Sequence, residues 1–311
     1  MNIAILNYPG ALQSAVHGLN EMFSMASQLC IEHQFSRNFD VDIIKFTADQ
    51  KLSLTDKTYT AVLLPPGLEN SFYLEPAEMV KSWLIEKHSQ GSILCSACAG
   101  SFIIASTGLL NNREATTHWG LVNTFTDHYP DVKLKANEIL ISDSDMITAG
   151  GMMSWVDLGL ELVAQFTSPG IMRQLGKMLV IDTGQREQRY YQQFSPRFTH
   201  GDDVILNIQK KIQTDFKQSI KITELAQFCF LTERTFLRRF VKATGLKPSE
   251  YLQRLRIQKA CEYLENSQHS FDVIANEVGY EDTGACRKIF VRLIGLTPGE
   301  FRKRFVSSRN Y

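Results

Sequence analysis

The sequence predicts two domains of different fold class: a doubly wound α/β domain on a parallel sheet, followed by an all-α domain with two helix-turn-helix units. Three observations lead to this prediction. A chain of 311 residues is long enough for about two domains. Short apolar strands alternate with helical segments over residues 1–180, as in a parallel sheet covered by helices on both faces. From Asp203 onward, helical periodicity continues almost to the end without a convincing strand.

The alternation in the first 180 residues defines the expected elements. We expect strands at residues 2–7, 41–46, 61–64, 92–95 and 146–148, and helices at residues 12–30, 76–88, 99–106, 152–166 and 171–180. Pro9-Gly10 ends the first strand and Pro65-Pro66-Gly67 ends the third, because Pro and Gly interrupt regular structure. Pro76 is placed at the start of a helix, where its missing N–H costs little.

The C-terminal third contains an internal repeat. Several residues recur fifty positions later with the same or a similar side chain: Phe240-Val241, Gly245-Leu246, Pro248 and Glu250-Tyr251 match Phe290-Val291, Gly295-Leu296, Pro298 and Glu300-Phe301. Upstream, Leu225-Ala226 matches Ile274-Ala275 at an offset of 49, so the second copy has one extra residue in between. Matches at one offset indicate a duplicated supersecondary unit.

Each copy predicts a helix, a tight turn and a second helix with a basic outer face, which describes a helix-turn-helix. Thr232 and Asp282 are the expected N-caps of the two second helices. The side chains expected to face inward are Phe236, Phe240, Cys286, Ile289 and Phe290, and those expected to face outward are Arg234, Leu237, Arg238, Val241, Thr283, Gly284, Arg287 and Lys288. Residues 249–264 form an amphipathic helix that separates the copies. An ordinary solvated helix face is the alternative for the outward cations.

The charge distribution separates the two parts. The chain carries 33 basic and 33 acidic side chains, which alone argues against nucleic-acid binding. Residues 1–200 nevertheless hold 14 basic and 20 acidic side chains, whereas residues 201–311 hold 19 and 13. Such asymmetry favours a nucleic-acid or membrane-surface module in the C-terminal third.

The C-terminal third resembles AraC/XylS-family transcription regulators over residues 205–305. The resemblance is carried by Gly279-Tyr280-Glu281-Asp282, Arg287, Phe290, Gly295-Leu296-Thr297-Pro298 and Arg302-Lys303-Arg304-Phe305. It implies two helix-turn-helix units that enter successive major grooves of double-stranded DNA, and RNA polymerase as a partner of an activator. Carried over by position, the base-reading candidates are Arg234, Leu237 and Arg238 in the first unit and Thr283, Gly284, Arg287 and Lys288 in the second.

Two positions depart from the family pattern. Cys286 stands where the family usually has Phe, a change expected to affect packing more than recognition. Gly284 has no side chain, so the second recognition helix is expected to contribute less base readout than usual.

The most informative stretch of the first domain is the strand-to-helix turn at Cys98. Small residues surround it at positions 96, 97, 99 and 100, as in a nucleophile elbow. A thiol at a helix N-terminus tends toward a lowered pKa, because the positive end of the helix dipole favours thiolate. Downstream, His118 is a residue that could approach Cys98.

This half resembles the PfpI-type branch of the class I glutamine-amidotransferase-like superfamily over about residues 1–180. The resemblance is carried by Tyr8-Pro9-Gly10, Leu64-Pro65-Pro66-Gly67, the segment 98–102, Gly108-Leu109-Leu110, Thr116-Thr117-His118-Trp119 and Thr148-Ala149-Gly150-Gly151. It implies a flavodoxin-like, amidotransferase-like fold in which the elbow Cys and a His can form a hydrolase, deglycase or hydratase site, here Cys98 and His118. Ala15 stands where the family commonly has Asp or Glu near the thiol. Because this carboxylate is absent, we expect a sensor of a small polar metabolite and no enzyme.

The expected ligand-binding residues are Gly10, Ala15, Cys98, Ala99, His118 and Trp119. Two alternatives stay open: Cys98 as a retained catalytic nucleophile, and a redox-sensing repressor that uses Cys95 with Cys98. No cofactor and no metal are expected, because no second C-x-x-C or suitably spaced His accompanies the single pair.

These expectations define a domain plan. Residues 1–182 form the sensor, residues 183–203 the linker and residues 204–311 the DNA-binding domain. Six scattered cysteines favour reduced thiols in a cytoplasmic protein, and neither a signal peptide nor a membrane span is expected. We expect a homodimer held by the N-terminal domain, with residues 152–166 and 171–180 as candidate contacts.

Overall fold

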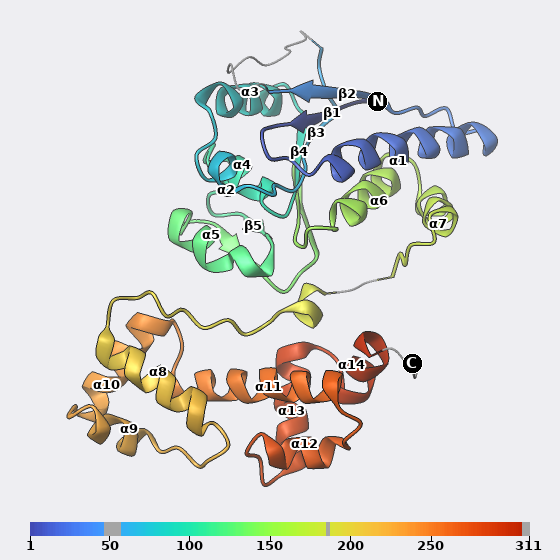
Figure 1. Cartoon of the computed structure of the whole chain (residues 1–311). Coiled ribbons are helices and arrows are strands. Elements are labelled where there is room, and N and C mark those ends of the chain that lie inside the picture. The colour runs from blue at the N-terminus through green and yellow to red at the C-terminus, as the bar shows by residue number, and fades with distance from the viewer. Residues whose placement is uncertain (47–56, 185–186, 307–311) are drawn as a thin grey trace. The chain divides into compact units, whose positions relative to one another are not determined.

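The computed structural model describes residues 1–46, 57–184 and 187–306. The chain forms two compact units, Met1–Gln188 and Arg189–Tyr311. Figure 1 shows the elements of both units. No helix in the described ranges is long and apolar enough to cross a membrane.

The first unit is built on a six-stranded sheet in the order β2-β1-β3-β4-β8-β7. Its strands are β1 (Asn2–Asn7), β2 (Asp40–Lys45), β3 (Ala61–Leu64), β4 (Ile93–Ala97), β7 (Leu140–Asp143) and β8 (Met146–Ala149). Neighbouring strands are parallel except β7, which pairs antiparallel with β8 at one edge. A separate two-stranded sheet joins β5 (Glu114–Ala115) to β6 (Lys133–Leu134).

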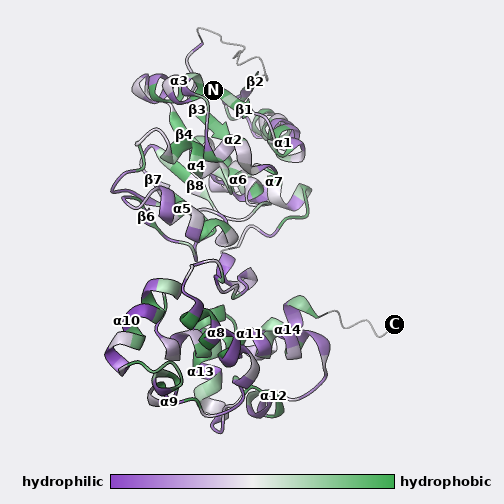
Figure 2. Ribbon diagram, turned by 60° about the vertical axis from the view of Figure 1, so that its left-hand side comes forward, coloured by the Kyte–Doolittle hydropathy of each residue, from purple (hydrophilic) through white to green (hydrophobic). Residues whose placement is uncertain are grey.

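Helices cover both faces of the large sheet (Figure 1). The helices are α1 (Gln13–Glu32), α2 (Asn70–Leu74), α3 (Glu78–Ser89), α4 (Gly100–Ala105), α5 (Val122–His128), α6 (Trp155–Phe166) and α7 (Pro169–Met178). Helices α1, α6 and α7 pack on one another, and α4 packs against α2 and α3. The central strands are apolar and fully buried, as β3 illustrates, because both of their faces are covered. Figure 2 shows them as the green, hydrophobic centre of this unit.

The predicted doubly wound α/β domain is confirmed, with local corrections. The helix expected from Pro76 begins at Glu78, with Ala77 as its N-cap, so the placement of Pro76 in the first turn was wrong. The helix expected from Met152 begins at Trp155, because a turn closed by the Ser154 N–H bond to Gly151 O (3.0 Å) precedes it. Strand β7 and the small sheet were not predicted, since short strands with mixed burial leave no clear period.

The second unit is all-helical within the described residues, as predicted. Its helices are α8 (Asp203–Asp215), α9 (Ile222–Phe228), α10 (Glu233–Thr244), α11 (Pro248–Asn266), α12 (Phe271–Glu277), α13 (Thr283–Ile294) and α14 (Pro298–Phe305). They enclose two apolar clusters, one for each copy of the repeat. Helix α11 contributes to both, with Tyr251 and Leu255 in the first and Ala260 and Leu264 in the second.

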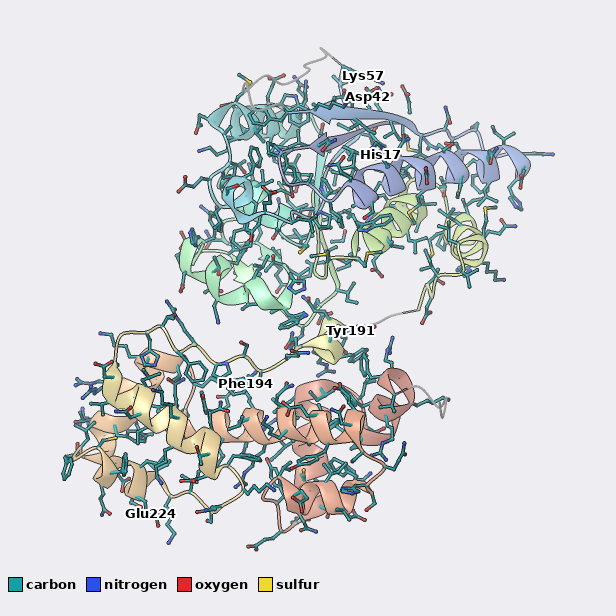
Figure 3. All side chains as sticks on the ribbon, viewed as in Figure 1. His17, Asp42, Lys57, Tyr191, Phe194 and Glu224 are labelled. Atoms are coloured by element: carbon teal, nitrogen blue, oxygen red, sulfur yellow. The ribbon has the colours of Figure 1, made fainter. Side chains whose placement is uncertain are left out.

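The predicted linker at 183–203 is divided by the observed units. Gln188, the first residue of a short 3-10 helix (Gln188–Tyr191), is buried in the first unit. The residues after it pack on the second unit: the ring of Tyr191 contacts Phe305 edge-on, and the ring of Phe194 contacts Tyr251. Figure 3 labels Tyr191 and Phe194 on this segment.

Candidate functional sites

The two copies of the repeat fold in the same way. The turn after the first helix of each copy closes with equivalent hydrogen bonds, from Leu231 N–H to Ala226 O (3.0 Å) and from Tyr280 N–H to Ala275 O (2.9 Å). The side chains of the predicted caps, Thr232 and Asp282, accept hydrogen bonds from the first turns of α10 and α13. The two helices then end at left-handed glycines, Gly245 (φ 74°) and Gly295 (φ 82°). The duplicated helix-turn-helix is confirmed.

The predicted inner and outer faces of α10 and α13 are also observed. Phe236, Phe240, Cys286 and Phe290 are fully buried. The side chains predicted to read bases lie on the opposite faces: Arg234, Arg238, Gly284, Arg287 and Lys288 are exposed, and Leu237 and Thr283 are half-buried. Their contact with DNA bases stays a prediction.

The outward cations have no acidic partner in the described part of the chain. No ion pair there involves Arg234, Arg238, Arg287 or Lys288. Some other cations of the unit are paired, as in the contact between Arg239 and Asp202 at 2.7 Å. Positive charge on the two outer helix faces is therefore available to an external anion.

Helix α11 sets the separation of the two recognition helices. It has 19 residues, which corresponds to a length of about 28 Å at 1.5 Å per residue. Successive major grooves on one face of B-DNA lie about 34 Å apart. Since α11 contributes to both apolar clusters, it joins the two copies over a length comparable to one DNA turn.

The predicted elbow at Cys98 is present at the end of β4. Cys98 has φ 54°, the left-handed backbone of a sharp strand-to-helix turn. Its N–H donates to Ala149 O (2.8 Å), and its carbonyl accepts from Ser101 Oγ (2.9 Å) and Thr117 Oγ1 (3.0 Å). A Cβ at Gly100 would lie 2.5 Å from Leu64 O, which explains the small residue there.

The Cys98 thiol is not activated. Its side chain is 3% exposed, and burial raises its pKa to about 12, although a backbone hydrogen bond from Ala99 acts in the opposite direction. Burial raises the pKa of Tyr8 and Tyr73, and both phenols lie close enough to Cys98 that its charge would raise them further. The lowered pKa expected from the helix dipole was wrong, because desolvation outweighs it. At neutral pH the thiol is protonated.

His118 and Cys95 do not supply the missing activation. The half-buried His118 has a pKa lowered by burial, and its Nδ1 accepts from Gly120 N–H (3.0 Å) while the ring packs beside Trp119. Within the described ranges no hydrogen bond joins His118 to Cys98. Cys95 and Cys98 are both free thiols, and burial raises the pKa of Cys95 as well. Neither a Cys–His pair nor a disulfide is assembled.

The other predicted ligand-binding residues lie at the carboxyl edge of the sheet or beside it. Ala15 and Ala99 are buried, Gly10 and Trp119 are half-buried. The loop containing Gly10 is joined to the loop after β3 by a bridge between Ala11 and Gly67. Cavities of about 540 and 570 Å³ lie elsewhere, one lined by Arg113 and Asp143 and one beside Asp202 and Arg239. The assignment of a ligand to the Cys98 edge stays a prediction.

Sequence reasoning missed Gln188. This side chain is 2% exposed and donates from Nε2 to Thr117 O (2.8 Å), within the segment that carries His118 and Trp119. It belongs to a polar run without periodicity, so no sequence signal distinguishes it from the solvated residues around it.

Two family models match the chain. A model described as a helix-turn-helix domain matches residues 225–304. A model of the DJ-1/PfpI family matches residues 34–165. The two matches fall in the second and the first compact unit respectively.

Curated relatives match over most of the chain at low identity. The HTH-type transcriptional regulator CdhR of Pseudomonas aeruginosa is 24% identical over 221 residues, which cover 71% of this chain and 66% of CdhR. The HTH-type transcriptional regulator GlxA of Rhizobium meliloti is 24% identical, with 66% of this chain and 64% of GlxA covered. The chain thus spans just under two thirds of these relatives. Among solved structures, a putative transcriptional regulator from Vibrio parahaemolyticus superimposes with a TM-score of 0.48 at 15% identity, over 58% of this chain and 98% of that one.

Proposed function

We propose that this chain, an AraC-type helix-turn-helix protein with an N-terminal DJ-1/PfpI domain, is a sequence-specific, double-stranded DNA-binding transcription regulator controlled by a small molecule. The observation that carries the proposal is the pair of outward basic faces on α10 and α13, whose cations have no acidic partner within the described residues. Matches to transcriptional regulators support the same function.

The DNA-binding part of the proposal follows from the two helix faces. Arg238 and Arg287 present guanidinium groups that can bind guanine edges in the major groove or phosphates. Arg287 lies 5.2 Å over the ring of Phe271, which restricts its positions before DNA is bound. Since α11, about 28 Å long, joins the two copies in one chain, a single chain can address two successive grooves.

The sensing part of the proposal concerns the first unit. In doubly wound sheets, ligands bind beyond the carboxyl ends of the strands, where Cys98, His118 and Trp119 lie. The protonated thiol suits a pocket wall and not a nucleophile. A small polar metabolite bound there controls DNA binding only if its affinity differs between two states of the protein.

We further propose a cytoplasmic homodimer, with RNA polymerase as partner if the chain is an activator. Because one chain already carries two recognition helices, dimerisation is assigned to the first unit. Apolar side chains are exposed near the C-terminal ends of α1 and α7: the exposed fraction is 73% for Ile31 and 56% for Met178. These are the proposed contacts.

Selection of bound duplexes from a random pool by the full chain tests the DNA-binding proposal. Arg238→Ala and Arg287→Ala are each expected to weaken binding to the selected sequence by about 10-fold or more, since a bidentate contact contributes roughly 1–3 kcal/mol of discrimination. Arg173→Ala, which removes an equal charge from the exposed side of α7, is the matched control and is expected to bind as wild type. Equal behaviour of all three variants would contradict the proposal.

A further inference from the structure

A carboxamide from the segment between the two units is fully enclosed in the first unit. Gln188 is 2% exposed, although it lies in one of the most polar stretches of the chain. Its backbone N–H donates to Asn137 O (3.0 Å), and the preceding residue, Glu187, pairs as a bridge with Glu138. The chain therefore pairs with the first unit through a single bridge at Glu187 and inserts the next side chain, that of Gln188.

The surroundings match both ends of a primary amide. Nε2 donates to Thr117 O (2.8 Å), to Thr116 Oγ1 (3.1 Å) and towards Glu138 O (3.1 Å). Oε1 accepts from the backbone N–H of Trp119 (3.2 Å). With two backbone carbonyls around the nitrogen and a backbone N–H at the oxygen, the network itself fixes the orientation of the amide. A carboxylate would place an anionic oxygen against the carbonyls of Thr117 and Glu138 without a donor.

The cavity that holds this amide is shaped by the fold. A Cβ at Gly150 would lie 2.5 Å from Gln188 Nε2, so the glycine after β8 provides the space. One wall is held in place by the hydrogen bond from Thr116 N–H to Thr148 Oγ1 (2.9 Å). Another is connected to the elbow, because Thr117 Oγ1 donates to Cys98 O.

The residues that follow Gln188 pack on the second helix-turn-helix. At Gly295, the C-cap residue of α13, a Cβ would lie 2.8 Å from the ring of Tyr190, so Tyr190 packs closely against this end of the helix. The guanidinium of Arg304 lies 5.3 Å over the same ring. One intervening residue, Arg189, has its Nη1 near Arg292 O. Gln188, the last residue of the first unit, is therefore followed directly in the sequence by residues that pack on the second.

The geometry points to a carboxamide-binding site at the carboxyl edge of the sheet that the chain fills with its own Gln188, and that takes a small molecule bearing a primary amide when Gln188 withdraws. Competition between Gln188 and the amide ligand is the regulatory step, because withdrawal of Gln188 from the site releases the residues after it, which pack beside the end of α13. This inference rests on the proposed function for its regulatory role, but not for the existence of the site. The tethered amide has a high effective concentration, so a competing amide needs additional contacts, for which the half-buried Trp119 is available.

Chemical rescue of a truncated side chain tests the site in the full chain. Gln188→Ala removes the amide and leaves its partners unpaired, so we expect the melting temperature of the first unit to fall by about 5 °C. Acetamide is expected to restore it in a saturable way. Gln188→Leu, which fills the space with an apolar group, and sodium acetate added to Gln188→Ala are the controls and should show no recovery. Equal responses of the alanine and leucine variants to acetamide would overturn the inference.

Hydrogen exchange at the Trp119 amide provides a second readout, local to the site, that compares the unaltered protein with Gln188→Leu. The Trp119 amide is expected to exchange at least 10-fold more slowly than in Gln188→Leu. Exchange at the same rate in both would show that Gln188 does not occupy the site. Neither readout requires DNA, so rescue without any DNA binding would refute the proposed function while the site stands. Rescue that leaves the DNA affinity of Gln188→Ala unchanged would overturn the regulatory step.

Discussion

Phe230 occupies the turn of the first helix-turn-helix in a backbone conformation that side chains disfavour. Its φ is 56°, and its ring is 98% exposed. The equivalent residue of the second copy is Gly279, with φ 87°. The turn is otherwise the same: Phe230 N–H donates to Gln227 O (2.9 Å), and Gly279 N–H donates to Asn276 O (3.0 Å). Phe230→Gly is therefore expected to stabilise the second unit.

The magnitude follows from the two states of the chain. Left-handed backbone costs an L-residue roughly 1–2 kcal/mol, and glycine avoids this cost. Glycine also gives the unfolded chain more conformational freedom, which reduces the gain in stability by roughly 0.4–1 kcal/mol. Because the exposed ring of Phe230 buries almost no area, its removal loses no packing. The net expectation is a stabilisation of about 0.5–1 kcal/mol and a rise of roughly 3–5 °C in the unfolding temperature of this unit.

Calorimetry of the full chain measures this change. Arg256→Ala identifies the transition of the second unit, because it removes the hydrogen bonds from this guanidinium to Phe216 O (2.7 Å) and Gln218 O (2.8 Å). Gly245→Ala is the matched control: φ is 74° and a Cβ there meets nothing within 4 Å, so it reports the cost of left-handed backbone alone. It should lower the unfolding temperature by a similar amount. If Phe230→Gly instead destabilises the unit while Gly245→Ala behaves as expected, the argument from backbone strain is refuted and the ring must contribute an interaction.

Three further predictions concern other parts of the chain. Cys98 should react with a neutral thiol reagent in the native protein far more slowly than a free cysteine at pH 8. Because its pKa in the folded protein, about 12, lies above the ordinary value of 9.0, the unfolded chain loses the proton first, and this thiol should lower the stability of the fold as the pH rises above about 9. Denaturant titrations at alkaline pH, compared with Cys98→Ala, would detect this loss. Asp202→Ala removes the N-cap of α8 and the partner of Arg239, and should lower the free energy of unfolding in urea by about 1–2 kcal/mol. Since Arg239 lowers the pKa of Asp202, the greater stability of wild type should disappear as the pH falls through this lowered pKa. A difference in stability that is unchanged at pH 2 would refute the assignment. Gly100→Ala places a methyl 2.5 Å from the backbone oxygen of Leu64 and should lower the first unfolding transition in the same calorimetric scan, whereas Gly91→Ala, with no neighbour within 4 Å, should show only a backbone effect.

Much of the architecture is predictable because it follows from patterns of local period. The buried run of β3 was located to the residue, and the repeat located the caps, turns and inner faces of both helix-turn-helix units. Short elements were missed where burial alternates poorly, as in β7. The site is predictable at the level of the elbow, since the small residues around Cys98 have a steric cause that the Gly100 contact confirms.

Properties set by long-range packing were not predictable. The pKa of Cys98 depends on its burial, which residues far away in sequence such as Tyr8 and Tyr73 help to create by lying near it, and this desolvation outweighs the helix dipole. The role of Gln188 depends on partners 50 to 72 residues away, from Thr116 to Glu138. No local pattern encodes either of them.

Protection of guanine N7 from methylation on a selected duplex tests the central claim most directly, because N7 lies in the major groove. Two recognition helices on one rigid chain predict two protected clusters about 10 base pairs apart on the same face of the DNA. Arg238→Ala should remove protection in one cluster and Arg287→Ala in the other. A single protected cluster that both variants weaken equally would contradict recognition of successive grooves by α10 and α13.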